Sequence, residues 1–193
     1  MRSFDELLGY IYNNQDHIDL SKCQNLSLAL NKLIKSIARE LKKENINYMI
    51  IGGQAVLVHG EPRLTKDIDI TLGLNVNGLE KILKIAKKLK FKLLVSDPEK
   101  FVKETFVLPF LNEKTDFRTD FIFSFSEYKK VVLKRVNKIK IDRTYVNFAS
   151  VEDLIIHKNV DFDYVLNWLK NFEVILEENL VQKFLNLKRE IGL

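Results

Sequence analysis

The spacing of apolar residues along this chain divides it into expected helices and strands. Between residues 26 and 41, leucine and isoleucine recur every three or four positions, which predicts a long amphipathic helix. A short apolar run at 48–51 ends at Gly52 and Gly53, and residues 54–59 can continue as a helix before Gly60. This part of the chain is therefore predicted to form a helix, a strand, a glycine turn and a short helix.

Residues 63–72 alternate between polar and apolar side chains. Ile68 and Ile70 fall on one side of an extended strand, and Asp67 and Asp69 fall on the other. The alternation predicts a half-buried strand whose two carboxylates share one face.

The middle of the chain has the pattern of further strands and one more helix. We expect a helix at 79–89, strands at 91–95, 106–111 and 117–125, and a hairpin at 139–147 that turns near Asp142 and Arg143. Pro109 has no backbone N–H to donate to a sheet ladder, so the strand at 106–111 is expected at a sheet edge.

The C-terminal part is expected to be helical from Ser150 onward. The Ser150 hydroxyl can cap a helix, and Asp153 completes a capping-box arrangement. Further apolar stripes follow at 165–172 and 180–187. No linker, repeat or low-complexity tract interrupts the sequence. We therefore expect a single α/β domain over 1–193, with a helical extension at 1–44, a core at 45–149 and C-terminal helices at 150–193.

The composition predicts a folded protein without a membrane span. Of the 193 residues, 46% are apolar and 30% are charged, which excludes a disordered or fibrous chain. No apolar run approaches the ~18 residues that a membrane helix needs, and residues 1–10 lack the apolar core of a signal peptide. The lone cysteine, Cys23, cannot form an internal disulfide. Together these features predict a cytoplasmic protein with no membrane partner.

The chain carries a net charge of +5, which favours a polyanionic partner such as nucleic acid or a triphosphate. Its densest basic stretch runs from Lys129 to Lys140. Two readings of that stretch remain open. We favour a solvated helix face followed by an edge strand, and the alternative is a surface that follows phosphate groups.

Asp67 and Asp69 are the residues with the clearest chemical meaning. Because they stand two positions apart on a strand, their carboxylates project from one face, about 6.5 Å apart at the backbone. Carboxylate oxygens are ligands for Mg²⁺, and two-metal phosphoryl-transfer sites hold their ions ~3.5–4 Å apart. Gly52 and Gly53 lack side chains, so their backbone N–H groups can approach a triphosphate at a helix N-terminus. The two halves together predict a site for a metal-bound nucleoside triphosphate (NTP).

The motif that contains these residues resembles the signature of the nucleotidyltransferase superfamily that includes polymerase β. The matching positions are Gly52-Gly53-x-Ala55, His59-Gly60 and Arg63-x-Thr65-x-Asp67-Ile68-Asp69. Within that superfamily the chain is most similar to the AbiE-type toxin nucleotidyltransferases. The resemblance implies a mixed β-sheet flanked by helices. It also implies a metal-dependent enzyme that uses two Mg²⁺ ions, with Mn²⁺ as an alternative, and an NTP as substrate.

The same resemblance implies a third carboxylate on a neighbouring strand, and the sequence offers Asp116 and Asp120. In the strand expected at 117–125, Phe121 and Phe123 share the core face, which leaves Asp120 on the opposite face. Asp120 is the preferred third acid, able to bind metal and to accept a proton as general base. Asp116 has the same parity but lies at the start of the strand. The alternative reading of Asp120 is an ion pair with a nearby basic residue.

Three further residues are candidates for binding the triphosphate. Lys158 lies on the inner stripe of the C-terminal helix, where relatives place a lysine; the alternative is a side chain that reaches solvent along apolar surface. Arg63 shares the strand parity of the acid pair, whereas Lys66 has the opposite parity and is assigned a structural role. Gln54 stands where many relatives carry a serine that contacts phosphate.

These features together predict a nucleotidyltransferase that moves a nucleoside monophosphate from an NTP to an acceptor. The resemblance implies RNA such as tRNA, or protein, as the acceptor. It also implies a toxin of a toxin–antitoxin or phage-defence system with a cognate antitoxin. Two alternatives stay open: a regulatory nucleotide- or nucleic-acid-binding module without catalysis, and transfer to a small molecule of the aminoglycoside type. An exposed basic surface around 129–140 would favour RNA, and an acidic pocket beside the site would favour a cationic drug.

Overall fold

The computed structural model describes residues 20–58, 66–124 and 131–157, together with residues 179, 181, 182 and 186. The chain divides into two compact units, Met1–Ala149 and Ser150–Leu193. This boundary falls where the sequence separates the expected core from the C-terminal helices. The grouping of both parts into one domain stays a prediction.

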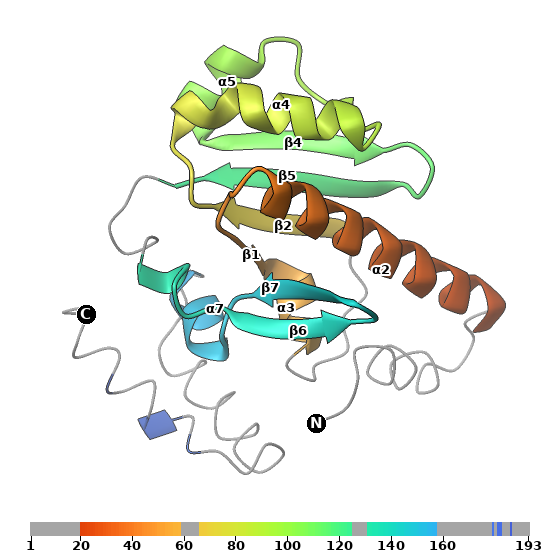
Figure 1. Cartoon of the computed structure of the whole chain (residues 1–193), viewed down its shortest axis with the longest axis vertical. Helices are drawn as coiled ribbons and strands as arrows, with labels where there is room; N and C mark the ends of the chain where they lie inside the picture. The colour runs from red at the N-terminus through yellow and green to blue at the C-terminus, as the bar shows by residue number, and fades with distance from the viewer. Residues whose placement is uncertain are drawn as a thin grey trace. The chain divides into compact units, whose positions relative to one another are not determined.

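The first unit is built on a seven-stranded mixed sheet with the spatial order β3-β4-β5-β2-β1-β7-β6 (Figure 1). Pairs β2–β5 and β1–β7 are parallel, and the other neighbouring pairs are antiparallel. The strands are β1 Tyr48–Ile51, β2 Asp67–Leu72, β3 Lys92–Leu93, β4 Val107–Asn112, β5 Phe117–Phe123, β6 Asn137–Ile141 and β7 Thr144–Phe148. The predicted mixed sheet flanked by helices is confirmed.

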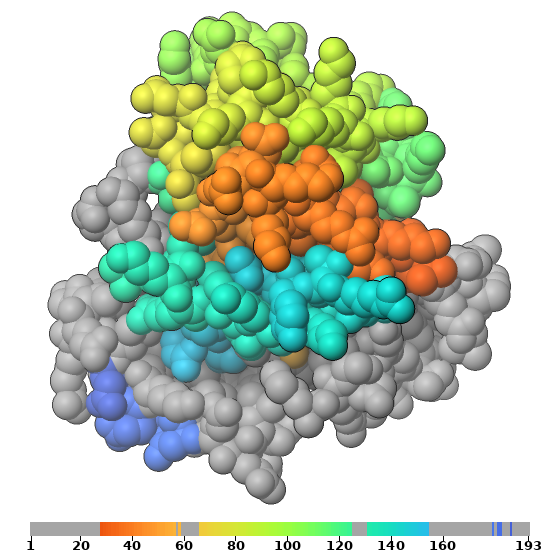
Figure 2. Space-filling view, viewed as in Figure 1, coloured from red at the N-terminus to blue at the C-terminus, as the bar shows by residue number. Residues whose placement is uncertain are grey.

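Two helices cover one face of this sheet. Figure 1 draws α2 (Leu20–Lys43) and α4 (Leu79–Lys88) in front of the strands, and Figure 2 shows their side chains covering that face. The remaining helices are α3 Gly52–Val58, the 3-10 turn η1 Val76–Gly78, α5 Pro98–Thr105 and, in the second unit, α7 Val151–His157. None of the described helices combines the length and apolarity that crossing a bilayer requires.

The core of the first unit lies between the helical layer and the sheet. Ile68 and Ile70 of β2 and Phe121 and Phe123 of β5 are all 0% exposed. The ring of Phe121 meets the ring of Phe110 edge to face at a centroid distance of 5.8 Å. The side chains that the alternation assigned to the core face are therefore the ones that the helices bury.

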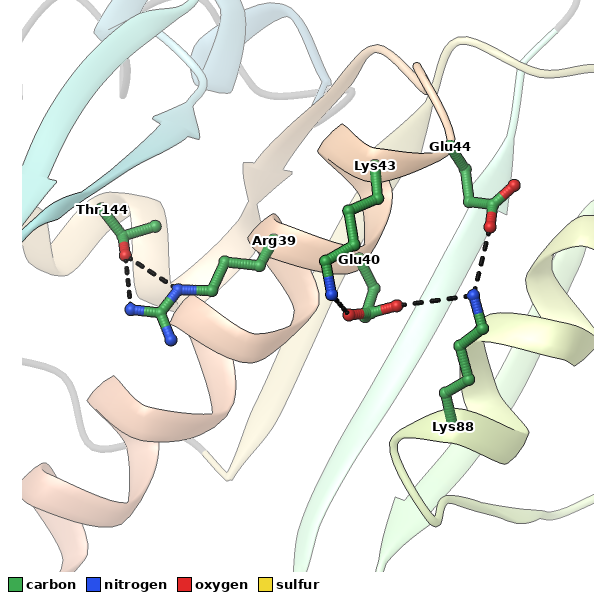
Figure 3. A network of polar contacts seen from close by, with 6 residues as sticks. All are labelled: Arg39, Glu40, Lys43, Glu44, Lys88 and Thr144. Carbon is green, nitrogen blue, oxygen red and sulfur yellow. Dashed lines mark hydrogen bonds and ion pairs between the residues drawn. The ribbon is translucent and has the colours of Figure 1, made fainter.

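Polar contacts on the surface connect α2 with its neighbours (Figure 3). Arg39 donates from Nε and Nη2 to Thr144 Oγ1 of β7, at 3.1 and 3.0 Å. The Lys88 ammonium of α4 lies 3.2 Å from Glu44 Oε1 and 3.6 Å from Glu40 Oε2. Exposed ion pairs of this kind contribute about 0–1 kcal/mol each, so apolar packing is the main force that holds α2 on the sheet.

The expected edge position of Pro109 is wrong, since β4 lies between β3 and β5. The Pro109 carbonyl accepts from the Leu94 N–H at 3.1 Å, on the β3 side. The N–H and C=O of one residue in an antiparallel ladder point to the same side, so the missing Pro109 donor also points toward β3. The β3 ladder covers only Phe110 and Leu111. The proline therefore falls at the end of the β3 ladder, where its carbonyl still accepts a bond from Leu94 and only one donor is missing.

The hairpin and the C-terminal cap agree with the sequence, whereas α5 was not predicted. The turn between β6 and β7 lies at Asp142 and Arg143. Ser150 Oγ accepts from the Asp153 N–H at 3.2 Å at the start of α7, as the capping box predicts. Helix α5 begins after Asp97, whose carboxylate accepts from the Lys100 N–H at 3.0 Å. The apolar stripe at 165–172 and most of that at 180–187 lie outside the described residues.

We expect Phe121→Ala to lower the free energy of unfolding by about 3–5 kcal/mol, because the substitution leaves a cavity in the closed core between sheet and helices. Urea unfolding followed by circular dichroism measures this change. The matched control is Tyr145→Ala, since Tyr145 is 62% exposed, and its unfolding free energy should change by no more than about 0.5 kcal/mol. A similar loss of unfolding free energy in both variants would contradict the placement of Phe121 in the core.

Candidate active site

The parallel pair of β2 and β5 brings the predicted acids together. Asp67 pairs in register with Arg118, and Asp69 pairs with Asp120. Laterally paired residues of a sheet point to the same face. The three carboxylates therefore share the face opposite to the one that α2 and α4 cover.

The Asp69 carboxyl group is partly buried and lies close to the other two acids. Burial raises the pKa of its carboxyl group above the ordinary value, the negative charges of Asp120 and Asp67 raise it further, and the positive charge of Arg118 acts in the opposite direction. The mutual effects mean that the three carboxylates and the guanidinium lie close enough to form one charged cluster. We call Asp67, Asp69, Asp120 and Arg118 the acid cluster.

Gly52 brings the main chain against this cluster. Its φ of +67° is a left-handed conformation, and a Cβ placed on it would overlap the Asp69 carboxylate oxygen Oδ2. Ile51, the residue before it, pairs with Asp69 across β1 and β2. A side chain at position 52 would be strained by the backbone conformation and would displace the Asp69 carboxylate, so glycine is favoured here.

Gly53 and Gln54, which were also predicted to contact the triphosphate, lie in α3. Gly53 is half-buried in the first turn, and Gln54 is only 1% exposed. Gly52 makes the expected turn with its left-handed φ, and helix α3 begins at this residue, so the helix starts two residues earlier than expected. The Gln54 side chain is packed inside the protein, so a phosphate would meet the backbone of this segment rather than the amide.

The structure places Asp120, and not Asp116, beside Asp69. Asp116 lies in the turn before β5 with a φ of +58°. Its carboxylate is exposed and forms an ion pair with Lys66 Nζ at 2.8 Å. Lys66 thus has a partner in this turn, consistent with a structural role.

Arg118 is the member of the acid cluster that was not predicted as a functional residue. Its Nε donates to Asp120 Oδ1 at 2.8 Å. The sequence held a signal for it, because Arg118 and Asp120 stand two apart on one strand and must share a face. The ion pair that was the alternative reading of Asp120 is therefore present, and it lies inside the cluster.

The chemistry of this cluster suits a divalent cation, although the described side chains do not already surround one. Hard cations such as Mg²⁺ prefer carboxylate oxygens, and a dication would offset the repulsion that raises the Asp69 pKa. Within the described part of the chain, no three acidic, histidine or cysteine side chains stand in positions to hold a metal ion. One of the two Asp120 carboxylate oxygens, Oδ1, accepts a hydrogen bond from Arg118. The donor set of three carboxylates has the chemistry that such an ion prefers.

Arg63 and Lys158, which were predicted to contact the triphosphate, lie outside the described residues. Their roles stay predictions.

Comparisons with known proteins identify similar structures but no family. The chain matches no protein-family model, and no curated protein is significantly similar to it. Among solved structures it is similar to an antigenic nucleotidyltransferase-like protein from Paracoccidioides brasiliensis, with 17% identity and a TM-score of 0.47 over 67% of this chain and 64% of that one. It is also similar to the antibiotic-resistance factor ANT(2'')-Ia, with 14% identity and a TM-score of 0.49 over 86% of this chain and 98% of that one.

A third similar structure is a CCA-adding enzyme in complex with ATP, with 19% identity and a TM-score of 0.43. That match covers 70% of this chain and 28% of the enzyme. The chain spans less than two thirds of the length of the first and third of these proteins. Because all three identities and TM-scores are low, the activity of this chain has to be inferred from its own residues.

We expect Asp69→Asn to stabilise the fold at neutral pH. An acid whose pKa is raised by folding loses stability as pH increases from its unfolded pKa, about 3.9, to the raised value, and the loss is complete above that value. Asparagine does not ionise, so the Asp69→Asn variant does not lose this stability at neutral pH. Thermal unfolding at pH 7 should show a higher melting temperature, by about 2–4 °C for each 1 kcal/mol of relieved repulsion.

The gain should shrink to nothing below about pH 3.9, where Asp69 is protonated in both states. Asp116→Asn is the control, because that carboxylate lies on the surface with Lys66, and no stabilisation is expected. A melting temperature for Asp69→Asn equal to or below that of the wild type at pH 7 would contradict the described cluster.

Proposed function

We propose that this protein is a metal-dependent nucleotidyltransferase that moves a nucleoside monophosphate from an NTP to a hydroxyl acceptor. The observation that carries the proposal is the alignment of Asp67 and Asp69 on β2 with Asp120 on β5, on one sheet face and against Gly52. Phosphoryl transfer from a triphosphate needs positioning and charge neutralisation more than covalent chemistry. A set of carboxylates beside a bare stretch of backbone supplies both.

Each residue has a defined part in the proposed reaction. Asp67, Asp69 and Asp120 would hold the divalent cations, which would supply charge neutralisation for the phosphates and for the leaving pyrophosphate. Gly52 and Gly53 allow the backbone to approach the triphosphate, and Arg63 and Lys158 contact it.

The reaction itself is an in-line displacement. The acceptor oxygen attacks the α-phosphorus as its proton passes to an Asp120 carboxylate oxygen. The bond between the α-phosphorus and the bridging oxygen then breaks, and pyrophosphate leaves.

The finer assignments follow from the sequence resemblance. We assign the chain to the AbiE-type branch, with a role as a toxin that a cognate antitoxin controls. A regulatory module that binds NTP without transferring any part of it is the alternative from another class, and a cationic small molecule is the alternative acceptor.

We expect Asp69→Asn and Asp67→Asn each to lower transfer by at least about a hundredfold, the scale on which loss of one electrostatic stabiliser acts. The measurement is incorporation of label from α-³²P NTPs, with Mg²⁺, into the components of a cell extract. Asp116→Asn is the control with the same chemical change outside the cluster, and it should keep near wild-type transfer. Full transfer by Asp67→Asn or Asp69→Asn would refute the assigned roles, and NTP binding without transfer by the wild type would favour the regulatory module.

RNA is the acceptor that the surface chemistry supports best. Lys138 and Lys140 of β6 and Tyr145 of β7 are exposed, and Tyr145 is a large aromatic ring that is 62% exposed. Lys140 pairs with Tyr145 across the hairpin. None of these three side chains has a polar partner in the described part of the chain. An exposed ring beside unpaired lysines is the combination that binds single-stranded nucleic acid by stacking and phosphate contact. We call these three residues the basic hairpin surface.

The basic hairpin surface lies on the same sheet face as the acid cluster. Ile50 of β1 pairs with both Ile70 and Phe148, so Phe148 shares the core face. Tyr145 has the opposite parity and therefore faces the same side as Asp69. Strands β7 and β6 are two and three strands from β2, or about 10 and 14 Å at ~4.8 Å per strand. A few nucleotides would span that distance.

We expect the double substitution Lys138→Glu with Lys140→Glu to weaken binding of a fluorescein-labelled 12-nucleotide single-stranded RNA by roughly tenfold or more, and Tyr145→Ala to weaken it by roughly 5- to 100-fold. Fluorescence anisotropy at fixed salt measures both. The matched control is Lys81→Glu with Lys84→Glu, the same charge change on the exposed side of α4, which should bind within about twofold of the wild type. Equal losses in both double variants would show only a net-charge effect and would exclude this surface as the RNA site.

A further inference from the structure

Arg118 has the position and the charge of a cation that belongs to the acid cluster. It stands opposite Asp67 in the β2–β5 register, and its Nε donates to Asp120 Oδ1 at 2.8 Å. The pKa of its guanidinium is raised, first by the hydrogen bond with Asp120 and also by the charges of Asp120, Asp67 and Asp69. A single side chain therefore interacts with all three carboxylates.

The contact with Asp120 conflicts with the metal-binding role of that residue. A divalent cation held by the three acids would use a carboxylate oxygen of Asp120, and the described Asp120 points one of its two oxygens at Arg118. A guanidinium in the same cluster would also repel the dication. Arg118 and a divalent cation are therefore competitors for the same carboxylate.

We infer that Arg118 acts as an internal counter-ion that competes with divalent metal for Asp120, so that metal binding requires the Arg118 side chain to leave the cluster. The inference rests on the metal role in the proposed function, and it assigns a positioning role to a residue outside the predicted site. Before a cation arrives, Arg118 neutralises part of the repulsion and holds Asp120 away from a metal-binding geometry.

The exposure of the pair makes such an exchange feasible. The Arg118 side chain is 50% exposed and that of Asp120 is 18% exposed. An ion pair that is open to water is weak, because solvent competes for both partners. Arg118 can therefore move into solvent as a hydrated cation, and an incoming divalent cation would replace it as the partner of the largely buried Asp120 carboxylate.

The test is a titration of Mn²⁺ binding in the absence of NTP and acceptor. Isothermal titration calorimetry, supported by the electron paramagnetic resonance signal of free Mn²⁺, would compare the wild type with Arg118→Gln and Arg118→Lys. Arg118→Gln should bind Mn²⁺ roughly three- to tenfold more tightly, because it removes both the competitor and its repulsion. Arg118→Lys keeps the charge and should stay within about twofold of the wild type.

Two controls define the result. Arg143→Gln removes an exposed arginine in the turn between β6 and β7, so it should leave Mn²⁺ affinity unchanged. Adding Asp120→Asn to Arg118→Gln removes the carboxylate for which Arg118 and the metal compete, so the tighter Mn²⁺ binding should be lost. Thermal unfolding of each variant verifies that it is folded.

The outcomes separate this inference from the proposed function. Mn²⁺ binding by Arg118→Gln that is equal to or weaker than that of the wild type overturns the inference, whether or not transfer is observed. Tighter binding by Arg118→Gln together with no transfer to any acceptor supports the counter-ion role and refutes the transferase activity. Failure of every variant to bind Mn²⁺ refutes both, because no cation then competes for Asp120.

Discussion

The register between the parallel strands β2 and β5 is the constraint on which the acid cluster depends. It places Asp69 beside Asp120, and burial together with the negative charges of Asp120 and Asp67 raises the pKa of Asp69. The opposite face of the same strands is fully buried, with Ile68, Ile70 and Phe121 all 0% exposed. A register shift of one residue would bury the acids and expose this core. Apolar packing on one side therefore fixes the geometry of the charges on the other.

The turn at Gly52 depends on the pairing of β1 with β2, the strand that carries two acids of the acid cluster. Because Ile51 pairs with Asp69, the chain leaves β1 at the level of the acid, and the next residue has to turn directly over a carboxylate. A residue without Cβ suits this position, because a Cβ on Gly52 would overlap Asp69 Oδ2. Gly52 and Asp69 are thus parts of one structural unit.

The sequence predicted those parts of the fold and site that follow from local periodicity. Alternation along β2 and β5 was sufficient to assign Asp67, Asp69 and Asp120 to the face opposite Ile70 and Phe121, because strand parity needs no knowledge of neighbours. The features that were missed depend on neighbouring strands or on rotamers. The interior position of Pro109 follows from the pairing of β4 with β3 as well as β5, which no pattern within β4 reveals.

Arg118 was likewise placed on the correct face by parity, but its contact with Asp120 is set by the conformation of two side chains. That contact places a positive charge beside the three carboxylates, which offsets part of their repulsion when no metal is bound. A buried ion pair would neutralise the acids but could not be displaced without a large desolvation cost. An arginine that is half exposed offsets part of the repulsion and can still retreat into water. In the proposed function, the weakness of this pair is therefore what allows Arg118 to offset the repulsion among the acids and then to give way to the metal.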